Sequence, residues 1–142
     1  MKTAELKQAL AGTTLDSRFC EIYGSAALET QKARYLHAVE EFEKLYGADR
    51  EAALYSVAGR SELSGNHTDH NHGCVIAASI DLDIIAVASP SAGSVIRVKS
   101  EGFPEDVVDF GVYNAPNPAR YEKSDSLIAG MVAGFRKEGL AV

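Results

Sequence analysis

Tryptophan is absent from the sequence, cysteine occurs twice, and basic residues are fewer than acidic ones. Cys20 and Cys74 lie far apart, in no spacing typical of a metal site or a redox pair, so we expect two reduced thiols. The 14 Lys and Arg residues against 20 Asp and Glu residues give a net charge of −6. This charge argues against nucleic acid as a partner, because phosphate binding needs a basic surface.

Long apolar runs are also missing. Residues 1–18 contain no continuous apolar stretch, which argues against a secretory signal. The most apolar segment, residues 74–88, is interrupted by Asp81 and Asp83 and is shorter than the roughly 20 residues of a membrane span. We therefore expect no membrane partner and a cytoplasmic location.

The remaining patterns indicate a mixture of helices and strands in one domain over residues 1–142, without repeats or a linker. Apolar side chains recur at helical spacing over residues 31–46, and Gly47 is typical of the position after a helix end. A second helix is predicted to begin with a cap at Ser124 or Asp125, to extend through Glu138 and to end at Gly139. We expect its buried side to comprise Leu127, Ile128, Met131, Val132 and Phe135.

Strands are predicted where valine and isoleucine are frequent. A short buried strand is expected over residues 53–57, and a further one over 106–110. Three more strand-like runs cover residues 74–79, 82–88 and 94–99. The turn composition of residues 89–93 predicts that the last two form an antiparallel hairpin.

The last residues, Leu140-Ala141-Val142, look like the opening of another strand. We therefore expect the chain to be incomplete at its C-terminus. An unpaired strand edge at Leu140 would favour self-association, because its backbone donors and acceptors have no partner.

The most informative segment is residues 59–73, with the sequence GRSELSGNHTDHNHG. Its glycines permit backbone bends and a close approach of the main chain to a ligand. Its polar groups suit a sugar, because a hydroxyl both donates and accepts: Asp69 can accept from two adjacent hydroxyls, while His67 and Asn66 can do either. The polar side chains of the segment are Arg60, Glu62, Asn66, His67, Asp69, His70, Asn71 and His72.

Three other interpretations of this segment remain open. His67, Asp69, His70 and His72 are metal-ligand types, as in a metal-dependent hydrolase, but their spacing matches no standard helical pair. The run 66–68 fits a glycosylation acceptor, which has little meaning without a secretory signal. The polar groups could also serve only to hold the loop together.

The segment resembles the galactokinase signature of the GHMP kinase superfamily, roughly Ala-Pro-Gly-Arg-Val-Asn-Leu-Ile-Gly-Glu-His-Thr-Asp-Tyr. The flanks agree, with a predicted helix ending in Tyr-Gly before it and Ile-Asp-Leu-Asp after it. The resemblance implies an α+β fold of the GHMP kinase N-terminal type, with a mixed or antiparallel sheet packed against helices. The match needs no insertion or deletion. Its positions are Gly59, Arg60, Leu63, Gly65, His67, Thr68, Asp69, Asn71 and Gly73.

The resemblance also implies roles for individual residues. Arg60 would lie near the hydroxyl that receives the phosphoryl group, as the catalytic residue of this segment. His67 would contact the 6-hydroxyl of galactose, and Asp69 the 3- and 4-hydroxyls. Asn66 stands where the family has glutamate, so it can hydrogen-bond the 6-hydroxyl only without charge. The other departures from the family pattern are Ala58 for proline, Glu62 for asparagine and His70 for tyrosine.

The activity implied is transfer of the γ-phosphoryl group of ATP to the 1-hydroxyl of galactose, with magnesium. Galactokinases hold the nucleotide phosphates on a Gly-Leu-Ser-Ser-Ser type loop at a helix start, and no segment of this sequence matches that loop. We therefore expect the chain alone to bind neither ATP nor magnesium and to be inactive. The alternative is a non-enzymatic, galactose-responsive binding protein of the same family.

Overall fold

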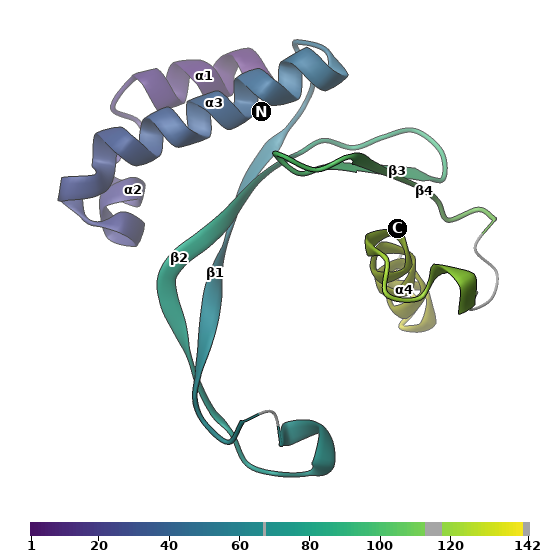
Figure 1. Cartoon of the computed structure of the whole chain (residues 1–142). Coiled ribbons are helices and arrows are strands. Elements are labelled where there is room, and N and C mark those ends of the chain that lie inside the picture. Colours follow the sequence, from purple (N-terminus) through teal and green to yellow (C-terminus); the bar gives the residue numbers. More distant parts are fainter. Residues whose placement is uncertain (67, 113–117, 141–142) are drawn as a thin grey trace. The chain divides into compact units, whose positions relative to one another are not determined.

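The computed structural model describes residues 1–66, 68–112 and 118–140, and the chain divides into two units, Met1–Pro90 and Ser91–Val142 (Figure 1). Each unit contains helices and one antiparallel pair of strands. The expected α+β class, with antiparallel strands and helices, is confirmed. Among the described residues, no helix combines the length and the apolar character needed to cross a membrane.

The first unit begins with three helices, α1 (Thr3–Ala11), α2 (Asp16–Tyr23) and α3 (Leu28–Tyr46), with a short 3-10 turn, η1 (Ser25–Ala27), before α3. The sequence patterns predicted only the third of them. Its apolar stripe is buried as expected, and Gly47 follows it with a positive φ of 91°. Leu10 of α1 and Phe19 of α2 pack on Tyr35 and Val39 of α3, and these four side chains form the core of the unit.

A long antiparallel hairpin follows, made of β1 (Ala53–Ser64) and β2 (Ile76–Ala88). One face of its first half contacts the helical core through Leu54, Ile85 and Val87. The register pairs Leu54 with Val87, so the alternating side chains of each strand point away from the helices. That outer face is apolar and exposed, with the side chains of Tyr55, Val57, Leu82 and Ile84.

Several strand predictions for this region were wrong. The strand expected over 53–57 continues to Ser64, and most of it is exposed rather than buried. Residues 76–79 and 82–88 of the two predicted runs lie on one strand, β2, which pairs with β1 and not with residues 94–99. Residues 74–75 lie outside it. The polar turn at 89–93 separates the two units instead of closing a hairpin.

The second unit contains β3 (Val95–Lys99) and β4 (Glu105–Asp109), which pair antiparallel, a short 3-10 helix η3 (Pro118–Arg120), and α4 (Ser124–Lys137). The predicted strand near 106–110 and the helix ending before Gly139 are confirmed. The predicted cap is wrong, since the helix starts after Lys123 and has no side-chain cap.

The predicted buried side of α4 is also largely wrong. Val132 is buried, but the side chain of Leu127 is 72% exposed. Leu140 belongs to no strand, and residues 141–142 of the expected strand lie outside the described residues.

Candidate functional site

The candidate sugar segment is divided between strand and loop. Arg60 lies on β1 opposite Ser79 of β2, and Glu62 lies two residues further on, opposite Ala77. The expected loop therefore begins only at Gly65, and it closes the hairpin at the end away from the helices (Figure 1). Arg60 and Glu62 share one face of β1, because side chains alternate along a strand. Arg60 is exposed and Glu62 is half-buried.

The loop is organised around the backbone carbonyl of Thr68. This oxygen accepts hydrogen bonds from the backbone N–H of Asn71 at 3.0 Å and of Gly73 at 2.8 Å. Thr68 itself donates its N–H to the carbonyl of Gly65 at 3.1 Å. Between these contacts lies the short 3-10 helix η2 (Asp69–Asn71), so Thr68 lies where two tight turns meet.

The chain packs so closely on itself in this loop that positions 65 and 73 have no room for a side chain. A Cβ on Gly73 would lie 2.4 Å from Oγ1 and 2.7 Å from the carbonyl oxygen of Thr68. A Cβ on Gly65 would lie 2.7 Å from the carbonyl oxygen of Cys74, and the φ of Gly65 is 111°. The glycines expected to permit close backbone approach therefore bring the loop against itself.

Two polar residues in the loop have backbone angles in the left-handed region. Asn66 has a φ of 46° and His72 a φ of 63°. Asparagine tolerates this region better than most residues do, because its short side chain hydrogen-bonds locally. The asparagine at the position where galactokinases carry glutamate therefore suits the turn that it occupies.

The predicted ligand side chains are only partly placed. Asn66 is exposed in the loop. His67 and the side chain of Asp69 lie outside the described residues, so their expected sugar contacts stay predictions. The metal interpretation depends on the same two side chains. In the part of the chain that the structure describes, no three His, Cys, Asp or Glu side chains are grouped to hold a metal ion.

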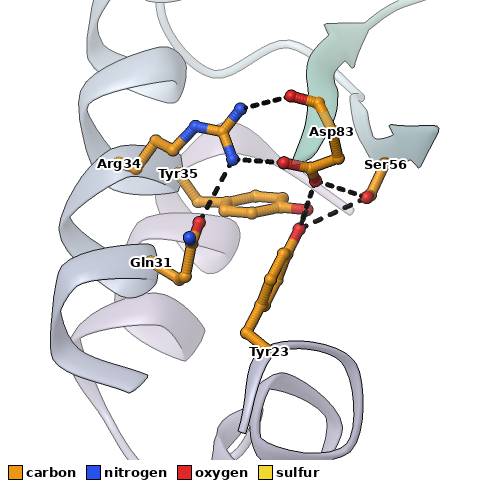
Figure 2. Close-up of polar contacts among 6 residues, drawn as sticks. All are labelled: Tyr23, Gln31, Arg34, Tyr35, Ser56 and Asp83. Atoms are coloured by element: carbon orange, nitrogen blue, oxygen red, sulfur yellow. Dashed lines mark hydrogen bonds and ion pairs between the residues drawn. The ribbon is translucent and has the colours of Figure 1, made fainter. Parts of the chain in front are cut away.

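A polar network that the sequence analysis missed joins the helices to the hairpin (Figure 2). We call it the Asp83 network. Arg34 donates to Oδ1 of Asp83 at 2.5 Å and to its carbonyl oxygen at 2.9 Å. Tyr23 and Ser56 donate to Oδ2 at 2.5 and 2.6 Å. The members are Tyr23 of α2, Gln31, Arg34 and Tyr35 of α3, Ser56 of β1 and Asp83 of β2.

The network sets the charge states of its members. Burial is the largest influence on Asp83 and raises its pKa, but the hydrogen bonds from Ser56, Tyr23 and Arg34 together outweigh it. They hold the pKa at about 2, below the ordinary 3.8. Burial, and then the hydrogen bond to Asp83, raise the pKa of the Tyr23 phenol. Asp83 is therefore ionised and Tyr23 neutral near pH 7. The signal for this site was an aspartate that breaks an otherwise apolar strand.

The N-termini of the described α-helices are acidic. Phosphates bind helix N-termini, where backbone N–H groups and the helix dipole favour negative charge. Each of the four α-helices has an acidic residue in its first turn instead: Glu5, Asp16, Glu29 and Asp125. Gly130 and Gly134 lie inside α4 and not in a loop that opens a helix.

Comparison with known proteins finds similarity to galactokinases. A family model described as the galactokinase galactose-binding signature matches residues 40–90, which run from the end of α3 to the end of the hairpin. Galactokinase from Lactococcus lactis subsp. cremoris (strain MG1363) is 27% identical over 104 residues, 72% of this chain and 26% of that protein. Galactokinase from Homo sapiens is 34% identical over 84 residues, 57% of this chain and 21% of that protein.

Galactokinase from Streptomyces coelicolor (strain ATCC BAA-471 / A3(2) / M145) is 33% identical over 73 residues, 51% of this chain and 19% of that protein. The chain thus matches about a quarter or less of the length of these curated relatives. No solved structure matches the chain significantly. Residues 40–90 thus match the galactokinase galactose-binding signature, and the chain is similar in sequence to part of these galactokinases.

Proposed function

We propose that the chain is the galactose-binding portion of a longer galactokinase. That enzyme would transfer the γ-phosphoryl group of ATP to the 1-hydroxyl of galactose, with magnesium. The match of residues 40–90 to the galactose-binding signature carries this proposal. We further propose that the domain spans residues 1–142 and is incomplete, because the chain covers only 26% of the Lactococcus enzyme.

The structure supports a division of roles along the hairpin. Arg60 is exposed on β1, five residues before the loop begins at Gly65, and its cation can stabilise negative charge that gathers in phosphoryl transfer. Guanidinium stays charged at any working pH. We assign the phosphoryl-receiving end of the sugar to Arg60. The remaining hydroxyls then face the loop that begins at Gly65.

We assign the 3- and 4-hydroxyls of galactose to Asp69 and the 6-hydroxyl to His67 and Asn66. Galactose differs from glucose in one axial hydroxyl, and a carboxylate that loses its donor costs about 1–3 kcal/mol or more. Asp69 would therefore carry the sugar preference. Asn66 is neutral and exposed, so its contribution is a hydrogen bond without a charge.

We propose that ATP and magnesium are held by other parts of the enzyme. A first-turn acid at each α-helix opposes phosphate there. The chain alone should then be inactive. The second candidate is a galactose-responsive binding protein without catalysis. The acidic first turns of the described helices favour it, and it retains the sugar loop.

Phosphorylation assays separate these candidates. The full reading frame that encodes this chain and the 142-residue chain are each incubated with labelled ATP, magnesium and galactose, with glucose as the control sugar. We expect galactose 1-phosphate from the full-length protein only. Galactose binding without product would favour the binding protein, and neither binding nor product would refute the proposed function.

A further inference from the structure

The Asp83 network lies at the boundary between the packed and the exposed half of the hairpin. Asp83 is opposite Ala58, and the next pair toward the loop, Arg60 with Ser79, follows a shift in register. On the helix side of this boundary, Leu54 and Ile85 contact the core. On the loop side, the side chain of Leu63 is 68% exposed. The network is therefore well placed to set the direction in which the outer half of the hairpin leaves the helices.

Its contacts are directional. The carboxylate of Asp83 meets donors from three elements, with Arg34 on one oxygen and Tyr23 and Ser56 on the other. Tyr23 gives its only proton to Asp83, so Tyr35 donates to the Tyr23 oxygen at 2.7 Å. Arg34 also binds the Asp83 carbonyl, which ties the backbone of β2 as well as the side chain. Charge-assisted bonds of this kind fix an orientation more narrowly than apolar contacts do.

Stability alone does not call for a charge at this position. Asp83 lies on the same face of β2 as Ile85 and Val87, which pack on the helices. An apolar side chain there would continue that stripe, and replacing a fully buried ion pair with apolar residues is often neutral or stabilising. This pair is partly buried, with the side chain of Arg34 37% and that of Asp83 11% exposed. The ion pair adds a fixed orientation of β2 relative to α3.

We propose that Asp83 is a positioning residue for the sugar site. It holds the outer half of the hairpin at the angle that presents Arg60 and the loop to the sugar, and it does not touch the sugar itself. The link to the sugar rests on the proposed function. The effect on the hairpin does not depend on it and can be measured in the chain alone.

Amide hydrogen exchange of the 142-residue chain tests the hairpin. Asp83→Asn should speed exchange at residues 60–64 and 76–79 about 10-fold, with little change in the middle of α3. The matched control is Asp16→Asn, which breaks the ion pair with Lys32 at 2.7 Å in the same unit but away from the hairpin. Unchanged exchange in Asp83→Asn, or the same increase in Asp16→Asn, would overturn the proposal. If Asp83→Asn does not fold, Ser56→Ala removes one bond to the carboxylate and takes its place.

Kinetics of the full-length protein test the link to the sugar. Asp83→Asn should raise KM for galactose about 10-fold and leave KM for ATP unchanged, whereas Asp16→Asn should change neither. An equal loss for both substrates would show a purely structural role and overturn the proposal. An unmodified protein that does not use galactose would refute the proposed function, while the exchange experiment would still decide whether Asp83 positions the hairpin.

Discussion

Replacing Gly73 with alanine tests whether the loop is as tightly folded on itself as the structure describes. The new Cβ would lie 2.4 Å from Oγ1, 2.6 Å from Cβ and 2.7 Å from the carbonyl oxygen of Thr68. The hydroxyl can rotate away, but Cβ and the carbonyl cannot. The same carbonyl accepts the hydrogen bonds from Asn71 and Gly73, so moving it breaks both.

The cost follows from these contacts. Forcing a methyl group into a filled space costs about 1–3 kcal/mol. Two backbone hydrogen bonds contribute about 1 kcal/mol each, and less where water can replace them. The loop is exposed, so we expect the loss to appear as local opening. Exchange of the Asn71 and Gly73 amides should become about 10-fold faster or more, with the helices of the first unit unchanged.

Gly130→Ala is the matched control. Its Cβ would meet nothing within 4 Å, and the residue lies inside α4. Alanine should stabilise that helix by about 0.5–1 kcal/mol. Hydrogen exchange followed by mass spectrometry measures both variants. Loop exchange in Gly73→Ala equal to that of the unmodified chain would show that the two turns are not in contact in solution.

Three further predictions concern the first unit. The pKa of Asp83 is lower in the folded than in the unfolded chain, so its ionised carboxylate stabilises the fold by about 2 kcal/mol above pH 4. This contribution is lost between about pH 4 and pH 2. Asp83→Asn should therefore flatten the pH dependence of the free energy of unfolding, measured in urea, over that range. Tyr23→Phe removes a hydrogen bond to a charged group and should lower the free energy of unfolding by about 1.5–3 kcal/mol in urea titrations, and an unchanged midpoint would contradict the network. The exposed apolar side chains of Leu82 and Ile84 should make the 142-residue chain self-associate, which light scattering measures as a larger particle. Changing both residues to lysine should reduce the particle size. A variant particle as large as that of the unmodified chain would assign the association to another surface.

Local patterns predicted the elements whose signals lie within a few residues. The apolar stripe that includes Tyr35 and Val39 identified α3, and the Gly-Arg and His-Thr-Asp spacing identified the candidate site before any fold was known. α1 and α2 were missed because they are short: each buries only one to three side chains, too few for a clear period.

Pairing between distant strands could not be predicted in the same way. The turn composition at 89–93 marks a true break, but composition does not say which strands pair across it. Burial was misjudged because an apolar strand such as β2 looks buried on both faces, whereas the structure covers only one. Asp83 was likewise seen only as an interruption, because its partners Tyr23 and Arg34 lie far away in the sequence.

We propose that the loop recognises galactose through Asp69. Asp69→Asn in the full-length protein keeps the size of the side chain but removes the charge to which two hydroxyls would donate. His72→Ala, at an exposed position outside the family motif, is the control. Steady-state kinetics should show roughly a 10-fold to 1000-fold lower kcat/KM for galactose in Asp69→Asn only, with KM for ATP and the thermal midpoint nearly unchanged. Equal losses in both variants, accompanied by lost stability or lost metal, would contradict the sugar assignment.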